Sequence, residues 1–250
     1  MRTTKELLEV MLENIDRLEG GLCTLAFDLS YAYRVALGKG VKLSIGLNAG
    51  IYWYKWNAQN EIANNISDPV LQQNVSKVLP DVGAGIYLYH KNFYFGASVP
   101  NFIKGDLNVK GASYGEGKRT PHFVLMAGGA IPAGKVLYIR PQIQYRYVAN
   151  AFNRMPHTLD FNLSLLFYNR VNIGGQYRTS FGNKNIGLKL KDPDSFDFMV
   201  EVWPTKQLMI GYAYDYTLTK IGDYNRGSHE IILGYDLGFS KKRVITPRYF

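Results

Sequence analysis

The feature that most constrains this chain is a polar/apolar alternation, seen clearly where residues 158–167 read Thr-Leu-Asp-Phe-Asn-Leu-Ser-Leu-Leu-Phe. A period of two places successive side chains on opposite faces of a β-strand. One face then holds Leu159, Phe161, Leu163, Leu165 and Phe167, and the other holds Asp160, Asn162 and Ser164. Because this pattern recurs along most of the chain, the two faces are predicted to meet two solvents, lipid and water. That favours a β-barrel of an outer membrane and argues against most enzyme folds.

Counting the alternating runs predicts about eleven strands and an all-β, antiparallel, up-and-down transmembrane β-barrel with about 11–12 strands present. The runs cover residues 22–37, 41–57, 80–90, 93–99, 120–132, 136–148, 157–168, 171–180, 196–204, 208–219 and 227–240.

The connections between these runs alternate between short and long. The short ones are 38–40, the stretch around 91–92, 133–135, 169–170 and 205–206, and the long ones are 58–79, 100–119, 149–156, 181–195 and 220–226. Outer-membrane barrels have short periplasmic turns and longer external loops. The order therefore predicts that the last strand runs inward and that the C-terminus is periplasmic.

The polar face of the predicted barrel carries charges of both signs, which we expect to point into the lumen. These lumen-facing candidates are Asp28, Arg34, Arg140, Arg146, Asp160, Arg178, Glu201, Asp215, Glu230 and Asp236. Such residues either cross-link a filled lumen or line a channel.

Composition narrows the class of partner. The formal net charge is +9, but the basic residues are scattered, and the one compact cluster is Lys241, Lys242 and Arg243. We therefore expect no nucleic-acid partner, an attraction to anionic envelope surfaces and a periplasmic position for this cluster. A mean hydropathy of −0.16 does not exclude a barrel, since polar and apolar faces average out. The single cysteine, Cys23, rules out an intrachain disulfide.

The first 19 residues differ from the rest because they interleave acidic residues with leucines in an amphipathic helical pattern. They do not resemble an export signal. We therefore expect a fragment of a longer protein, with residues 1–21 as a remnant, either a helix or a partial strand, and residues 22–250 as the barrel.

No motif predicts catalysis, a cofactor or a metal. Ser228-His229-Glu230 looks catalytic, but in a strand His229 faces away from both neighbours, so a triad cannot form there. The four histidines lack metal-ligand spacing. We therefore predict a protein that is not an enzyme. A soluble ligand-binding barrel, with its apolar face inward, is the structural alternative.

Several short segments, taken in their order along the chain, carry a family resemblance: Tyr31–Arg34, Ser67–Val70, Val82–Tyr87, Phe93–Pro100, Tyr214–Tyr216, Gly227–Tyr235 and Pro247–Phe250. Together they resemble the PorP/SprF outer-membrane proteins of the type IX secretion system of Bacteroidota. The resemblance implies a barrel of about fourteen strands, so the chain would lack the first three and closure would be incomplete.

The resemblance also implies a function. Proteins of this family assist the secretion, and often the surface attachment, of adhesins and gliding-motility cargo with type B C-terminal signals. The implied location is the cell outer membrane, and the implied partners are its lipid, the secretion machinery and the cargo. A passive pore for small solutes is the alternative function.

Overall fold

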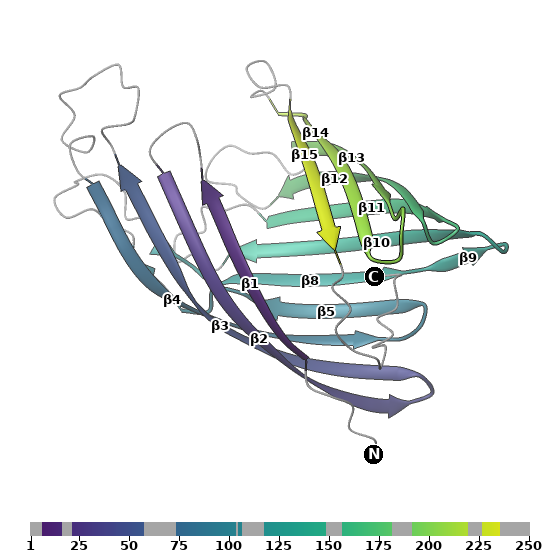
Figure 1. Ribbon diagram of the computed structural model, residues 1–250, viewed down its shortest axis with the longest axis horizontal. Helices are drawn as coiled ribbons and strands as arrows, with labels where there is room; N and C mark the ends of the chain where they lie inside the picture. The colour runs from purple at the N-terminus through teal and green to yellow at the C-terminus, as the bar shows by residue number, and fades with distance from the viewer. Residues whose placement is uncertain are drawn as a thin grey trace. The chain divides into compact units, whose positions relative to one another are not determined.

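The structure, a computed structural model, is built from β-strands (Figure 1). It describes residues 7–16, 22–57, 74–103, 105–106, 118–148, 157–181, 192–219 and 227–235. None of these residues forms a helix long and apolar enough to cross a membrane. The strands are β1 (Leu7–Asp16), β2 (Leu22–Gly38), β3 (Val41–Asn57), β4 (Asn74–Tyr89), β5 (Phe93–Val99), β6 (Gly105–Asp106), β7 (Lys118–Arg119), β8 (His122–Gly129), β9 (Ile131–Ala133), β10 (Leu137–Val148), β11 (His157–Phe167), β12 (Val171–Phe181), β13 (Asp192–Val202), β14 (Leu208–Thr217) and β15 (Ser228–Tyr235).

The sheet order follows the chain order. It is β1-β2-β3-β4-β5-β8-β10-β11-β12-β13-β14-β15, with β9 paired to β10 and with β6 and β7 forming a separate two-stranded ladder. The ladders β1–β2, β10–β11, β11–β12, β12–β13, β13–β14 and β14–β15 are all antiparallel. The predicted all-β, antiparallel, up-and-down architecture is confirmed.

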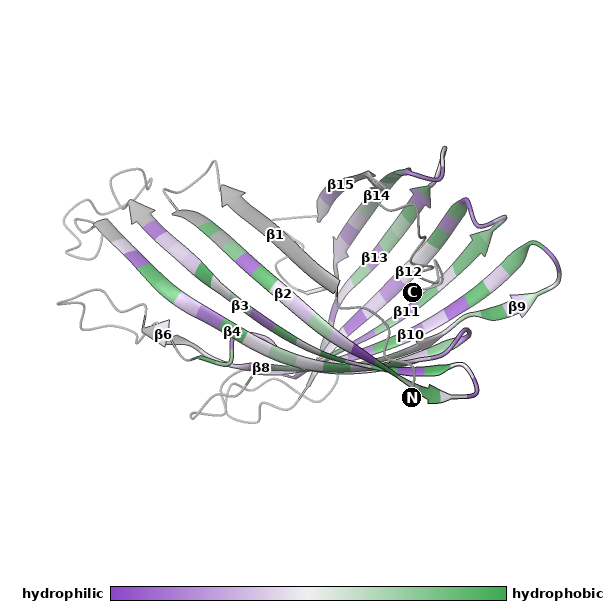
Figure 2. Ribbon diagram, turned by 60° about the horizontal axis from the view of Figure 1, so that its bottom comes forward, coloured by the Kyte–Doolittle hydropathy of each residue, from purple (hydrophilic) through white to green (hydrophobic). Residues whose placement is uncertain are grey.

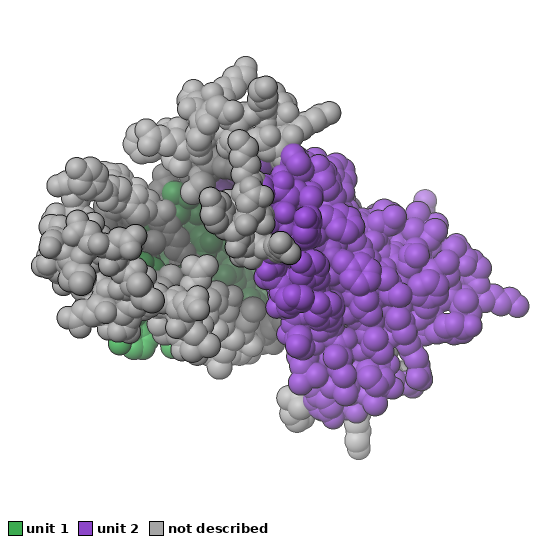
Figure 3. Space-filling model, turned by 90° about the horizontal axis from the view of Figure 1, so that it is seen from above, with its two compact units in different colours: residues 1–37, 42–87, 98–123 green, residues 38–41, 88–97, 124–250 purple. Residues whose placement is uncertain are grey.

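The chain divides into two compact units (Figure 3). Unit 1 comprises residues 1–37, 42–87 and 98–123, and unit 2 comprises residues 38–41, 88–97 and 124–250. Strands β10–β15, with their cross-strand polar contacts, all lie in unit 2.

Burial within the sheet is the reverse of that in a soluble protein. On β11, Phe161 and Leu163 expose 45% and 55% of their surface, whereas Asp160 exposes 5%. Among the described residues, the only buried hydrophobic side chains are those of Ala130 and Leu166. Figure 2 shows hydrophilic and hydrophobic positions alternating along the strands. An apolar face this large is stable in lipid, whereas in water it would promote association.

The short turns lie at or within one residue of the predicted positions, and one of them is a type I′ turn. The Arg170 backbone N–H donates to the Phe167 carbonyl at 2.9 Å, and φ is 51° at Tyr168 and 54° at Asn169. Positive φ at both central positions matches the right-handed twist of the flanking strands. The turn therefore centres on residues 168–169, one residue earlier than predicted.

The N-terminal segment is a strand, so the helical alternative for residues 1–21 is wrong for residues 7–16. Its register places Leu8, Val10 and Leu12 opposite Tyr31, Leu29 and Phe27 of β2. Leu8 and Leu12 fit a helical period, but together with Val10 they also fit a period of two, and pairing with β2 selects the strand.

Other boundaries also differ from the prediction. The run 120–132 is split into β8 and β9 at Ala130, whose N–H donates to the Asn92 carbonyl at 2.8 Å. Strand β13 begins at Asp192 rather than at residue 196, and strand β4 begins at Asn74 rather than at residue 80. The extra residues of β13, Asp-Pro-Asp-Ser, contain no alternating apolar side chains, so hydrophobic alternation could not reveal them.

Candidate functional site

The candidate site is the polar face of strands β10–β13 in unit 2. Cross-strand register aligns Gln144 with Asp160 and Asp160 with Arg178, so one row of polar side chains crosses three strands. A second row aligns Gln142, Asn162, Gln176 and Asp197. Directly opposed residues have Cβ atoms close enough for hydrogen bonds and ion pairs.

Asp160 is the centre of the first row. The Arg178 Nε–H donates to its Oδ1 at 2.8 Å, and a terminal nitrogen of Arg146 lies 3.9 Å from its Oδ2. The Asp160 side chain is 6% exposed, whereas those of Arg146 and Arg178 are 38% and 28% exposed. A nearly buried carboxylate is thus compensated by two arginines that still reach water.

The second row and its neighbours continue the network. The Gln176 side-chain amide donates to one carboxylate oxygen of Asp197 at 3.0 Å, and the Ser195 hydroxyl donates to the other oxygen, also at 3.0 Å. Further along β12, Asn172 donates to Glu201 at 2.8 Å. These bonds fix neighbouring strands to one another through side chains in addition to the backbone ladder.

Arg140 lies on the same face of β10, opposite Ser164 of β11. It is 8% exposed, and its Nε makes no hydrogen bond with the described residues. Glu201 and Tyr94 lie close enough to interact with its charge. Arg140 therefore belongs to the polar face but is more deeply buried than Arg146 and Arg178.

A cavity of about 260 Å³ opens in this polar face. Its lining residues are Tyr94, Met126, Gln142, Ile143, Gln144, Arg146, Asp160, Asn162, Gln176 and Arg178. The lining combines amides, two guanidinium groups and one carboxylate, so the cavity can hydrogen-bond water or a polar chain segment.

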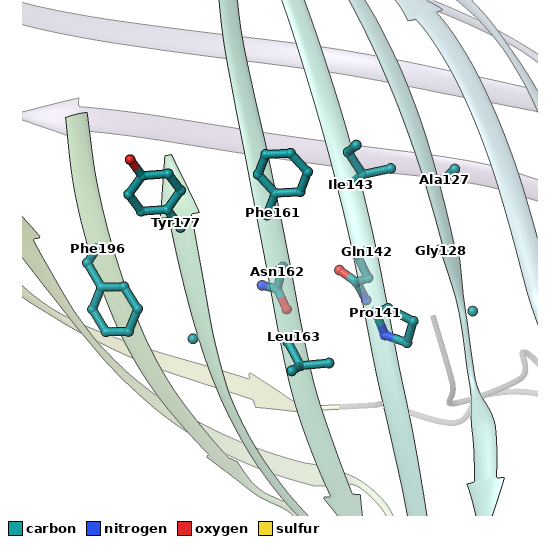
Figure 4. A pocket seen from close by; sticks show the side chains of 12 residues that line it. Ala127, Gly128, Pro141, Gln142, Ile143, Phe161, Asn162, Leu163, Tyr177 and Phe196 are labelled. Carbon is teal, nitrogen blue, oxygen red and sulfur yellow. The ribbon is translucent and has the colours of Figure 1, made fainter. Parts of the chain in front are cut away.

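The opposite, apolar face carries a shallow hollow of about 690 Å³, shown in Figure 4. Its lining includes Gly129, Gly175 and Pro141, which have little side-chain bulk, and the aromatic rings of Phe161, Tyr177 and Phe196. A Cβ at Gly175 would lie 3.2 Å from the Phe196 ring. In a bilayer, such a hollow would be filled by lipid chains.

The remaining sequence candidates lie elsewhere. Asp28 and Arg34 lie on β2 in unit 1, and Asp28 lies over Gly50, where a Cβ would clash with its carboxylate. Asp215 is half-buried on β14, and Glu230 is exposed on β15. Outside the described residues lie Asp236, Lys241, Lys242 and Arg243.

The register of β15 shows on which face of the sheet the side chains of Ser228, His229 and Glu230 lie. Ser228 is paired with Asp215, His229 with Tyr214 and Glu230 with Ala213, so His229 points to the apolar face. Its Nδ1 lies 2.7 Å from the Tyr212 hydroxyl. The prediction that His229 faces away from Ser228 is confirmed. Within the described residues, no group of three His, Cys, Asp or Glu side chains could hold a metal ion.

Sequence reasoning missed several members of the polar network, notably Asp197 and Gln176. Asp197 lies between Phe196 and Phe198 in a predicted strand, so the same alternation could have identified it. Gln142 was placed on the polar face by alternation, but its place in the row with Asn162 and Gln176 depends on register across strands, which one sequence does not reveal.

No curated protein matches the sequence. Among solved structures, the chain is similar to an outer membrane channel from Pseudomonas putida F1, at 10% identity and a TM-score of 0.44, over 91% of each chain. Residues 15–235 match the family described as type IX secretion system membrane protein PorP/SprF. This match spans most of the chain, and the chain therefore belongs to the PorP/SprF family of type IX secretion system membrane proteins.

Proposed function

We propose that this chain is a non-enzymatic outer-membrane β-barrel component of the type IX secretion system. In this role it assists the secretion or surface attachment of cargo such as adhesins and gliding-motility proteins. The observation that carries the proposal is the family match over residues 15–235, which coincides with the sheet from β2 to β15. The inverted burial of β11 supports the membrane location, because its apolar side chains are exposed and its polar ones are buried.

In the proposed orientation, the long connections lie outside the cell and meet the cargo. The short turns, together with Lys241–Arg243, face periplasmic partners. The charges of the polar face line the lumen, where the Asp160–Arg178 pair joins β11 to β12. Because outer-membrane barrels keep their shorter turns on the periplasmic side, the alternation of connection lengths supports this orientation.

Deleting the gene tests the role in secretion. We expect a cargo with a type B C-terminal signal to disappear from the cell surface, and the gene supplied in trans to restore it. Labelling of intact cells with an antibody against the cargo measures the display. Proteins that lack such a signal serve as the control and should be unaffected. Normal display of the type B cargo in the deletion strain would contradict the proposal.

A passive pore for small solutes is the second candidate function. The observation in its favour is that Arg146 and Arg178 remain 38% and 28% exposed beside a polar cavity. Conductance of the purified protein in a planar bilayer separates the two functions. A steady conductance together with normal cargo display would favour the pore, whereas a silent bilayer would argue against it.

A further inference from the structure

The cavity in the polar face of unit 2 is bordered by two rows of planar polar side chains. The register sets Gln144, Asp160 and Arg178 in one row and Gln142, Asn162 and Gln176 in the other, and all six line the cavity. Rows two residues apart along a strand are separated by about 7 Å, and neighbouring strands by about 5 Å. These six side chains, called the polar grid below, therefore cover an area on the scale of one sugar ring.

The cavity offers both acceptors and donors to a ligand. The Asn162 Oδ1 atom is buried and accepts no hydrogen bond from the described residues, although buried polar atoms usually have a partner. Arg146, which also lines the cavity, has a terminal nitrogen 3.9 Å from Asp160 Oδ2, too far for a hydrogen bond. A ligand that both donates and accepts hydrogen bonds matches these groups.

The size and polarity of the cavity narrow the class of ligand. Its volume of about 260 Å³ equals that of about nine water molecules in the liquid. One monosaccharide fits this volume, whereas a longer chain would have to extend out of it. Pockets for drug-like molecules are lined mainly by hydrophobic side chains, but most residues that line this cavity are polar. The ligand should therefore carry polar groups on most of its atoms.

The charges at the cavity favour a neutral ligand. Arg146 and Arg178 both lie beside Asp160. Asp197 and Asp194 also lie close enough to Arg178 to interact with its charge. Because the guanidinium groups already have carboxylates near them, an anion would be repelled as well as attracted. A hydroxyl group, with one donor and two acceptor lone pairs, avoids this repulsion and matches amides and guanidinium groups alike.

An aromatic ring borders the cavity on the side of β5. A Cβ at Gly128 would lie 2.6 Å from a ring carbon of Tyr94, so the ring lies across this glycine. Tyr94 also lines the cavity, where its ring provides apolar surface. The C–H face of a sugar packs on such a surface, while its hydroxyl groups need polar partners. The two kinds of lining together fit a sugar better than an inorganic ion.

We propose that this cavity binds one ring of a neutral saccharide. The side-chain amides of Gln142, Gln144 and Asn162 hydrogen-bond the hydroxyl groups of the sugar. Arg146 supplies a further donor, and the Tyr94 ring packs against the C–H face. The site depends on the register of β10–β12 and not on a role in secretion, so the secretion experiment and the binding experiment can fail independently.

NMR of the full chain in dodecylphosphocholine micelles, with ¹⁵N-labelled glutamine and asparagine, tests the proposal. Detergents with sugar headgroups are avoided because they would compete for the site. The probes are the methyl glycosides of glucose, galactose and mannose. We expect at least one of them to shift the side-chain amide signals of Gln142, Gln144 and Asn162, with a Kd of about 1–10 mM. Gln207, in the exposed turn before β14, is the internal control and should not shift.

Methionine variants test the part played by the amides, since methionine keeps the length of glutamine without its polar group. We expect Q142M and Q144M each to weaken binding about three- to tenfold, measured from the amide signals that remain. The matched control is T217V, which removes a hydroxyl from the polar face of β14, outside the cavity, and should leave the Kd unchanged. Circular dichroism verifies that each variant retains its sheet, and either methionine variant suffices for the comparison.

Two further probes separate the sugar from other polar ligands. Glycylglycine represents an extended peptide, and inorganic phosphate represents an anion; neither should shift the amides of the polar grid. If either did so while no sugar did, the proposal would be overturned in favour of that ligand. The proposal also fails if no amide shifts at about 100 mM sugar, tenfold above the weakest expected Kd. Equal weakening by T217V and Q144M would overturn it as well.

Discussion

Asp160 illustrates how a charge becomes stable within a membrane-spanning sheet. Its carboxylate is almost buried, yet Arg178 donates to one oxygen and Arg146 lies near the other. All three side chains occupy the polar face, so their charges stay away from the lipid side. A buried charge of this kind is tolerated only with such compensation.

Replacing Asp160 by Asn keeps the shape of the side chain but removes the charge shared by two guanidinium groups. We expect D160N to lower the free energy of unfolding by about 1.5–3 kcal/mol, a moderate value because the arginines are partly exposed and screened by water. Urea unfolding in lipid vesicles measures the change. The variant E230Q, at an exposed position of the same face, is the control and should differ by less than about 0.5 kcal/mol. Equal stabilities of the two variants would contradict the assigned role.

Two glycines of the polar face give a second matched pair. A Cβ at Gly174 would lie 2.7 Å from the Ser164 Cβ and 3.1 Å from the Leu163 carbonyl, whereas at Gly211 the nearest atom is 3.5 Å away. We therefore expect G174A to destabilise the protein by about 1–3 kcal/mol through overpacking. The variant G211A should be neutral or slightly stabilising, because alanine restricts the unfolded chain. The same unfolding measurement gives the free energy of unfolding of both variants. If G174A were as stable as the unmodified chain, β11 and β12 would have to separate locally to make room for the added Cβ.

Each strand of the sheet has one lipid-facing side and one polar side. Leu163 lies near the middle of β11 on the apolar face and is 55% exposed. Leu37 has comparable exposure, 57%, but lies at the end of β2, next to the turn at Gly38. The two leucines therefore differ in depth and not in exposure.

A lysine at these two positions tests which solvent the apolar face meets. We expect L163K to cost about 2–4 kcal/mol, because it places a charge near the membrane midplane, and L37K to cost about 0–1 kcal/mol near the interface. Unfolding in vesicles of a lipid with fourteen-carbon chains measures both. If L163K were as stable as L37K, the apolar face would not lie in hydrocarbon.

The strands were predictable to the extent that their side chains alternate. Strands β3, β5, β10, β11 and β12 have the expected bounds to within one residue. Prediction failed where the pattern was ambiguous or absent, as in residues 7–16, which fit two periods, and in the polar start of β13 at Asp192. Most charged members of the site were found from alternation, although Asp197 was missed. The pairing of Asp160 with Arg178 depends on register, which the sequence of one strand does not contain.

The orientation of the whole molecule in the membrane determines which connections face the cell exterior. The sequence contains one cysteine, Cys23, so a C23S background permits single-cysteine labelling. Lys135 lies in a short turn between β9 and β10, and Thr219 lies just beyond β14, at the start of a long connection.

Labelling of intact cells with a membrane-impermeant maleimide distinguishes these two ends. We expect the variant T219C to be labelled in intact cells and K135C to be labelled only after the outer membrane is permeabilised. Both reactivities should be equal in the unfolded, detergent-solubilised chain, which controls for intrinsic accessibility. The reverse pattern would place the long connections in the periplasm.

The sheet order, which runs from β1 to β15 in chain order, has a kinetic consequence. Because each strand pairs with the strands that precede and follow it in the sheet order, contacting residues are close along the chain and the contact order of the sheet is low. Loop closure then costs little entropy at each step, and the slow search for distant partners that delays many β-proteins is avoided. Such a chain can add hairpins one after another to a growing edge, so the rate of assembly should depend on how fast each hairpin enters the bilayer.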